Sequence, residues 1–451
     1  MPTLHAASAL TPEGWRTDVR IAIEGATIAS ATPAVPAQAG DERHEIVLPA
    51  LANLHSHAFQ RAMAGLAERR GPSADSFWSW RETMYRFALL MSPDDVEAVA
   101  AQLYVEMLEA GFASVAEFHY LHHAPDGAPY ASPGEMAGRI VAAARDVGIG
   151  LTLLPVFYAH ATFGGAPPKP EQRRFVNDIR SFARLIDDCD RYVEGGDERI
   201  GVAPHSFRAA TPDQLADVAA MAPDGPVHIH VAEQMKEVED CLAWSGKRPV
   251  RWLLDKADVD ERWCLVHATH MDADEARDAA TSGAVVGLCP VTEANLGDGV
   301  FDAPAFIDAG GRYGVGTDSN VSVSAADELR QLEYSQRLAL RARNVLAPPG
   351  GSTGRATVDA ALCGGAQALA RRCGRLEAGA VADILTLSAD HPTLEGKTDD
   401  NILDAWIFSA GNRAVDCVWS GGRKVVEAGR HVARDRIAAR FKAAMRRLLK
   451  R

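Results

Sequence analysis

Several features are missing from this chain of 451 residues, and each absence narrows what the protein can be. No uninterrupted apolar run approaches the ~18 residues needed to cross a bilayer, so no membrane contact is expected. The first residues, MPTLHAASAL, contain neither a basic start nor a long apolar segment, and no signal peptide is predicted. The seven cysteines are scattered without a Cys-x-x-Cys pair, which predicts reduced thiols in a cytoplasm rather than a disulfide framework.

Familiar catalytic and phosphate-binding signatures are missing as well. The chain contains no His-Glu-x-x-His, and no Gly-x-Gly-x-x-Gly follows its first barrel-type strand. Gly396-Lys397-Thr398 is similar to the end of a phosphate loop, but His391 stands where the first glycine of such a loop would be. Acidic residues outnumber basic ones to a formal net charge of −13, so nucleic acid is not expected as a partner.

What is present is the composition of a globular protein, with 47% hydrophobic and 24% charged residues. From residue 46 onward, apolar β-rich segments alternate with Ala- and Glu-rich segments that open with the capping residues Ser92, Thr211 and Asp272. Eight such units in series predict a closed parallel (β/α)₈ barrel, with an open doubly wound sheet as the alternative. The predicted strands cover residues 46–57, 112–118, 149–157, 199–205, 227–232, 263–268, 284–289 and 312–317.

The two ends of the chain share a different pattern of short strands and tight turns. Residues 19–23 and 27–29 are predicted strands, and the stretch LEAGAVADILTL returns to the same pattern after the last barrel helix. We therefore expect both ends to join in one small β-sandwich domain beside the barrel. The predicted division is a small β domain at residues 1–46 and 375–430, a barrel at 47–374 and a C-terminal helix at 431–451.

The C-terminal helix is basic and amphipathic. Its apolar side carries Ile437, Phe441, Met445 and Leu448. We expect this side to pack against the body of the protein or against a second subunit rather than against a membrane.

The stretch LANLHSHAF, residues 51–59, ends the first predicted barrel strand with two histidines. Residues two apart in a strand share one face, so His55 and His57 can bind the same cation. Two histidines buried without a metal would leave ring nitrogens unsatisfied and would repel each other when protonated. His-x-His alone is only moderately specific, and ordinary core or surface histidines remain the alternative at this point.

Other polar residues follow the carboxyl ends of later strands, where the chemistry of such a barrel takes place. His230 and Glu233 follow the fifth strand, His267 ends the sixth and Asp318 follows the eighth. Three imidazoles and one carboxylate suit a divalent ion, with zinc favoured and iron or manganese tolerated. Each residue has an ordinary alternative, because Asp318 could cap a helix, Glu233 could be solvated and His267 could be a core histidine. His228 lies farther from the strand end than His230, so we expect it to support the site rather than to bind the ion.

This pattern resembles the amidohydrolase superfamily, in particular its mononuclear aminohydrolase branch, and the resemblance covers nearly the whole chain. It implies that the metal ligands are His55, His57, His230 and Asp318. It further implies that the catalytic residues are Glu233, His267 and Asp318. The binuclear branch usually has a carboxylated lysine at a barrel strand end. No lysine lies in residues 149–157 or 199–205, so one metal ion is expected.

More narrowly, the chain is similar to a branch of this superfamily that acts on a glutamate-derived amidine, through LHSHAFQRAMAG, SFWSWRETMYRF, EFHYLHH, PHSFR and HIHVAEQ. The resemblance implies a homodimer that hydrolyses N-formimidoyl-L-glutamate to N-formyl-L-glutamate and ammonia in histidine degradation. It implies that the substrate carboxylates are bound by Gln60, Arg81, Tyr120, His205 and Arg208. Arginine is suited to bidentate binding of carboxylates.

Arg81 has a second interpretation. It lies in a long aromatic-rich connection, residues 71–91, which is predicted to act as a lid over the site. In the alternative, Arg81 is a surface arginine stacked on a tryptophan.

The expected mechanism begins with a water activated at the metal, which loses a proton to Asp318 or His267 and attacks the formimidoyl carbon. Glu233 then donates a proton to the imine nitrogen, and His267 stabilises the charge on the attacking oxygen. One rival function is a nucleobase or nucleoside aminohydrolase with the same metal ligands. A second is a hydrolase of cyclic amides, which the missing lysine disfavours, and a third is a non-catalytic barrel that binds an acidic metabolite.

Overall fold

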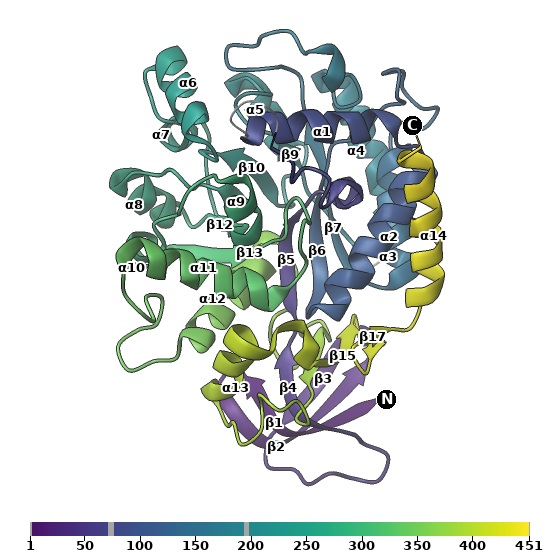
Figure 1. The fold of residues 1–451 in the computed structure, drawn as a ribbon, viewed down its shortest axis with the longest axis vertical. Helices are drawn as coiled ribbons and strands as arrows, with labels where there is room; N and C mark the ends of the chain where they lie inside the picture. The colour runs from purple at the N-terminus through teal and green to yellow at the C-terminus, as the bar shows by residue number, and fades with distance from the viewer. Residues whose placement is uncertain (1, 71–75, 194–197, 451) are drawn as a thin grey trace.

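The computed structural model describes residues 2–70, 76–193 and 198–450, which form a barrel with a small sheet attached to one end (Figure 1). The barrel strands are β5 (Leu51–Ser56), β6 (Phe112–His119), β7 (Gly150–Phe157), β8 (Arg199–Ile200), β9 (Ala203–Pro204), β10 (Val227–Val231), β11 (Trp263–His267), β12 (Val285–Leu288) and β13 (Arg312–Val315). They pair in parallel as β5-β6-β7-β8, with β9 also on β7, and as β10-β11-β12-β13. Two bridges, Ser56 to Asp318 and Val202 to Val227, join these runs. The predicted parallel barrel is confirmed.

Two predicted strands are divided in the structure. Residues 46–57 belong partly to β4 (Glu42–Pro49) of the small sheet and partly to β5, because the backbone changes partner at Ala50. The N–H of Ala50 donates to Asp383 of the small sheet, whereas that of Leu51 donates to Gly111 just before β6. Residues 199–205 form β8 and β9, and Val202 between them pairs with β10 instead of β7.

The predicted capping residues begin helices on the outside of the barrel. Ser92 caps α2 (Pro93–Glu109), Thr211 caps α5 (Pro212–Ala220) and Asp272 caps α8 (Ala273–Ser282), and each side chain accepts a backbone N–H of the first turn. These predicted helix starts are confirmed. The remaining helices of this part include α3 (Glu135–Val147), α4 (Ile179–Val193), α6 (Met235–Ser245), α7 (Pro249–Lys256), α9 (Pro290–Leu296), α10 (Ala303–Asp308), α11 (Ala325–Leu340) and α12 (Thr353–Ala368).

The predicted connection at residues 71–91 contains helix α1 (Phe77–Leu90), and its residues 71–75 lie outside the described part of the chain. Ser76 caps α1 by accepting the N–H of Trp78. In Figure 1, α1 lies across the end of the barrel opposite the small sheet. Helix α1 therefore covers the end of the barrel at which the polar residues follow the strands.

The two chain ends form one eight-stranded sheet, as predicted. Besides β4, its strands are β1 (Thr3–Thr11), β2 (Gly14–Glu24), β3 (Thr27–Thr32), β14 (Ile384–Leu387), β15 (Val415–Ser420), β16 (Arg423–Glu427) and β17 (Arg430–His431). Strand β4 joins the two ends, since it pairs in parallel with β1 and antiparallel with β14. The strands form a single sheet and not the two sheets of the predicted sandwich, and its residues Leu4, Ile21 and Trp419 share a small core of their own. Leu385 and Val418 belong instead to the core of the barrel.

The C-terminal helix α14 (Arg434–Leu448) packs along α2 (Figure 1). Ile437 and Leu448 are buried on its inner side. Arg447 of α14 forms an ion pair of 2.6 Å with Asp95 at the start of α2. Among the described residues, no helix combines the length and the apolar character needed to span a bilayer.

Candidate metal and catalytic site

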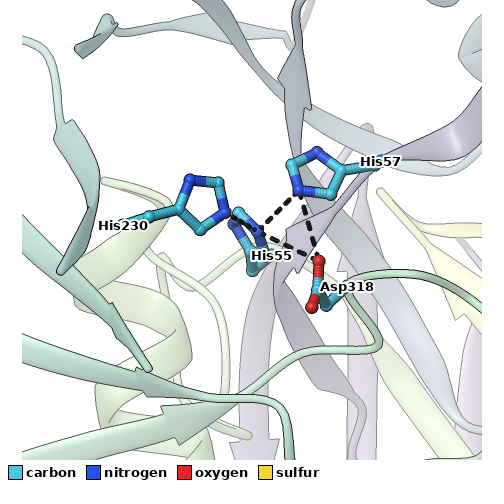
Figure 2. Close-up of side chains that lie close together, drawn as sticks. All are labelled: His55, His57, His230 and Asp318. Atoms are coloured by element: carbon cyan, nitrogen blue, oxygen red, sulfur yellow. Dashed lines mark hydrogen bonds and ion pairs between the residues drawn. The ribbon is translucent and has the colours of Figure 1, made fainter. Parts of the chain in front are cut away.

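The structure brings the four predicted metal ligands together at the mouth of the barrel (Figure 2). The Nε2 atom of His55 lies 3.2 Å from Nε2 of His57 and 3.1 Å from Nε2 of His230. The Oδ1 atom of Asp318 lies 3.2 Å from Nε2 of His57 and 3.5 Å from Nε2 of His55. All four side chains are buried, and their ligand atoms lie within 4.8 Å of one another.

Hydrogen bonds on the outer side of the rings show that this cluster suits a cation. Nδ1 of His57 lies 2.9 Å from the carbonyl oxygen of Phe118, and Nδ1 of His230 lies 3.1 Å from that of His205. Because a carbonyl only accepts, both Nδ1 atoms carry the proton and both neutral rings present a lone pair at Nε2. Lone pairs that converge on Nε2 of His55 repel one another unless a cation lies among them. The donor set therefore fits one divalent ion.

Backbone contacts hold the ligands of β5 against the segment that follows β13. The N–H of Asp318 donates to the carbonyl of His55, and the N–H of His57 donates to the carbonyl of Asp318. A Cβ at Gly316 would lie 2.7 Å from the backbone nitrogen and oxygen of His55, so only glycine permits this approach. Asn320 donates its side-chain amide to the carbonyls of His57 and Asp318. The ligand positions are thus fixed by the backbone.

Burial and neighbouring groups set the charges of the cluster. Burial lowers the pKa of His55 to about 3. Burial alone would raise the pKa of Asp318, but its hydrogen bonds with His55 and His57 hold that pKa well below its ordinary value. A neutral imidazole and an ionised carboxylate are the forms that bind a metal.

The predicted catalytic residues Glu233 and His267 lie beside the cluster. Nε2 of His267 is 3.9 Å from Oε1 of Glu233 and 3.8 Å from Oδ2 of Asp318. On the other side of the ring, Nδ1 lies 3.3 Å from Oε1 of Glu293. Burial alone would lower the pKa of His267, but the surrounding carboxylates raise it to about 10. Glu233 and His267 thus lie where the sequence predicts them, whereas Glu293 is a further residue of the site that the strand-end pattern does not indicate.

One pocket is lined by His57, His230 and Asp318 of the cluster, by Glu233 and His267, and by all five predicted substrate-binding residues, Gln60, Arg81, Tyr120, His205 and Arg208. Arg208 is buried, and its Nη2 lies 3.4 Å from Oε2 of Glu233. Its Nε and the Oε1 of Gln60 have no hydrogen-bond partner among the described residues. The pocket therefore offers an unsatisfied cationic donor next to the proposed acid.

Arg81 combines both interpretations made from the sequence. Its guanidinium lies over the ring of Trp78 at 4.6 Å and near that of Tyr85 at 5.6 Å, while the residue lines the pocket from α1. The apolar wall of the pocket includes Phe77, Trp80 and Met84 of the predicted lid, together with Tyr158 and Phe175. The spacing of aromatic residues in SFWSWRETMYRF could have indicated a helix with one aromatic face.

His228 lies away from the cluster. It is buried, and its Nε2 is 2.8 Å from the carbonyl oxygen of Ala368 in α12. It is not part of the group of converging ligand atoms.

Comparisons with known proteins agree with this geometry. The profile described as Amidohydrolase family matches residues 46–425. The chain therefore belongs to the amidohydrolase family. The profile described as Formimidoylglutamate deiminase HutF, N-terminal domain, matches residues 1–45, so the two profiles together account for most of the chain.

Individual relatives narrow the similarity within that family. The chain is 50% identical to formimidoylglutamate deiminase of Pseudomonas aeruginosa, covering 100% of both proteins. It is 28% identical to 8-oxoguanine deaminase of the same bacterium, covering 88% of this chain and 86% of that protein. The crystal structure of an amidohydrolase from Brucella melitensis is 58% identical, with a TM-score of 0.96 and 100% of both chains covered. These matches place the chain beside the formimidoylglutamate deiminases.

Proposed function

We propose that this protein hydrolyses N-formimidoyl-L-glutamate to N-formyl-L-glutamate and ammonia in the degradation of histidine. The proposal rests on one observation, a pocket in which Glu233, His267 and the buried Arg208 lie beside the predicted metal ligands. A substrate with two carboxylates needs cationic partners, and Arg208 and Arg81 supply them in a chain whose net charge is −13. The relative that is 50% identical over its full length has the same activity in its name.

The proposal includes one divalent ion, with zinc favoured by the chemistry of the donors. His55, His57, His230 and Asp318 would hold it, leaving a position open as in catalytic sites with few protein ligands. When bound, such an ion supplies a water that is nucleophilic at neutral pH.

The residues of the chain then move the protons. Nε2 of His267 faces carboxyl oxygens of Glu233 and Asp318, and the ionised carboxylate of Asp318 can only accept, which favours a proton on Nε2. We therefore assign the base to Asp318, which takes the first proton from the attacking water, and we assign to His267 the stabilisation of negative charge on the attacking oxygen. Glu233, protonated when the substrate is bound, donates its proton to the imine nitrogen, and Asp318 then passes the proton it took from the water to the same nitrogen. The bond from carbon to that nitrogen breaks, ammonia leaves, and the hydroxyl proton returns to Glu233 as the formyl carbonyl forms.

Binding of the substrate carboxylates is assigned to the other polar residues of the pocket. Within the described ranges, Arg208 has donor capacity left beside Glu233 and the carbonyl oxygen of the Gln60 amide has no partner, while its nitrogen donates to Tyr120 at 2.7 Å. Arg81 approaches from α1, which covers the mouth of the barrel (Figure 1). A covered pocket of this kind excludes bulk water, which strengthens the ion pairs inside it.

We further propose that the protein works as a homodimer in the cytoplasm, without nucleic acid or a membrane as partner. All seven cysteines are free and six of them are buried, which suits a reducing compartment. The acidic net charge supports the exclusion of nucleic acid. Light scattering of the purified protein measures the subunit number directly.

The decisive experiment measures ammonia release from N-formimidoyl-L-glutamate by the metal-loaded protein, before and after chelation, beside a panel of nucleobases. We expect release from the amidine alone, and its loss on chelation. The similarity to 8-oxoguanine deaminase makes a nucleobase aminohydrolase the second candidate. Ammonia from guanine or 8-oxoguanine, with none from the amidine, would establish that second candidate instead.

The role of Arg208 is tested in the same assay. Arg208→Ala should lower kcat/KM by roughly 10- to 100-fold, because a charge-assisted hydrogen bond contributes about 1.5–3 kcal/mol. An unchanged kcat/KM would remove Arg208 from the carboxylate site.

A further inference from the structure

Glu293 is a buried carboxylate that contacts His267 on the side of the ring opposite Glu233 and Asp318. It lies on α9 and is 5% exposed. Its Oε1 is 3.3 Å from Nδ1 of His267, on the side of the ring that faces away from Glu233 and Asp318. Glu293 is not among the residues that line the pocket. Its direct contact with the residues of the pocket is therefore the ring of His267.

Glu293 also has a purely structural contact, which must be separated from any effect on His267. Its Oε1 accepts the N–H of Cys289, 2.9 Å away, at the start of α9. Glu328 of α11 makes a similar capping contact. Its Oε2 accepts the N–H of Val291, 2.9 Å away, in the first turn of the same helix. Glu328 is also fully buried, and no hydrogen bond or ion pair to His267 is seen for it in the described part of the chain. The chain thus contains a matched pair of buried glutamates at one helix start.

We propose that Glu293 is the positioning residue of His267, which holds the Nδ1 proton and thereby keeps Nε2 directed at Glu233 and Asp318. This inference rests on the proposed function, since it concerns the residue assigned to stabilise the attacking oxygen.

The physical reason lies in the symmetry of the imidazole ring. The ring torsion of histidine is broad and roughly two-fold, so the ring needs a partner to select one orientation. A carboxylate at Nδ1 accepts only from an N–H, which fixes the proton on that nitrogen. Its negative charge also stabilises positive charge on the ring, as the aspartate does in a Ser-His-Asp triad. The backbone of His267 itself is left-handed, with φ of 66°, so its placement at the strand end is already constrained.

Three variants separate positioning from helix capping. Glu293→Met removes the acceptor from both His267 and Cys289, and Glu293→Gln keeps an acceptor oxygen without the charge. Glu328→Met removes the matched acceptor from Val291 alone. We expect kcat to fall by roughly 100-fold in Glu293→Met and roughly 10-fold in Glu293→Gln, with KM changed by less than about three-fold. Glu328→Met should keep kcat within about two-fold of wild type and lose only thermal stability.

Two outcomes would overturn the inference: a kcat near the wild-type value in Glu293→Met, or an equal loss in Glu328→Met. If Glu293→Met does not fold, Glu293→Gln decides, and an unchanged kcat in that variant overturns the role of the carboxylate.

A second readout does not depend on the substrate. A downfield imidazole N–H proton signal should disappear in both His267→Asn and Glu293→Met and persist in Glu328→Met. Its persistence in Glu293→Met would refute the contact. Failure of the wild-type protein to release ammonia from the amidine would instead refute the proposed function.

Discussion

The two ends of the barrel differ in what they bury. The barrel mouth, defined by His55, His57, His230, Glu233 and Asp318, buries charged and polar groups that face one another. At the opposite end, the barrel base meets the small sheet through a continuous apolar core. That core includes Trp406, which follows helix α13 (Asp400–Ala405).

The backbone differs in the same way. At the mouth, Ala232, His267, Ala268, Asp318 and Asn320 have positive φ without being glycine. Left-handed backbone costs non-glycine residues about 1–2 kcal/mol each. The mouth therefore combines strained backbone with buried charged groups, and both raise the free energy of the folded state.

At the base, close packing relies on glycine. A Cβ at Gly364 of α12 would lie 2.1 Å from the carbonyl oxygen of Tyr313, so glycine lets the helix lie directly on β13. The apolar base therefore supplies the stability that offsets the strained backbone and the buried charges of the catalytic mouth.

Among single substitutions, we therefore expect the largest effect from a change at the barrel mouth, and we expect this effect in kcat. Glu233→Gln preserves shape and can still accept from Arg208, but it cannot donate the proton that the imine nitrogen needs. We expect kcat to fall by roughly 1,000-fold, with bound metal and melting temperature close to wild type. Steady-state kinetics, metal analysis and thermal denaturation measure the three quantities. A kcat within ten-fold of wild type would show that Glu233 is not the acid.

The second largest effect is expected from a substitution at the barrel base, which should lower the free energy of unfolding. Trp406 is fully buried, and its indole nitrogen has no hydrogen-bond partner among the described residues. Trp406→Ala should lower the free energy of unfolding by about 3–5 kcal/mol, because it leaves a cavity between barrel and sheet. The kcat of the molecules that remain folded should not change. Trp406→Phe, which loses no hydrogen bond, should cost less, and a loss of kcat without a loss of stability would contradict the division between mouth and base.

The difference between the two ends also explains which parts of the site could be predicted. His55 and His57 share a face because side chains alternate along a strand. Parallel strands of a closed barrel end on the same side, so residues distant in sequence, such as His230 and Asp318, could be expected to meet. These inferences need only local periodicity and the closure of the barrel.

The missed parts depend on contacts that periodicity does not encode. Glu293 is a glutamate in the first turns of a helix, where it reads as a cap, and only the folded structure shows that the same oxygen also faces His267. Residues 46–57 read as one strand because β4 and β5 are both apolar, although the backbone changes sheets at Ala50. The sequence predicts a connection where the structure has helix α1, because the many aromatic residues of this segment have a low helix propensity.

The smallest expected effect lies away from both ends, on the surface helix α14. Burial alone would raise the pKa of Asp95, but hydrogen bonds from Ser92 and Arg447 hold that pKa below its ordinary value of 3.8. A lowered carboxylate pKa stabilises the folded state above pH 3.8, and this contribution is lost as the pH falls through the lowered value. Arg447 is half exposed, so Arg447→Ala should lower the free energy of unfolding by only about 0.2–1 kcal/mol at pH 7.

Urea unfolding tests this expectation from pH 7 down to an acid pH, below 3.8, at which Asp95 of the folded protein is protonated. The neighbouring Arg446 is exposed and forms no ion pair in the described part of the chain, so Arg446→Ala is the matched control. The difference between the two variants should shrink toward zero as Asp95 becomes protonated. A difference that persists in acid would mean that the alkyl chain of Arg447, and not its charge, fastens α14 to α2. Because this contact is far from the barrel mouth, kcat should be the same in both variants, which separates surface stability from the chemistry of the mouth.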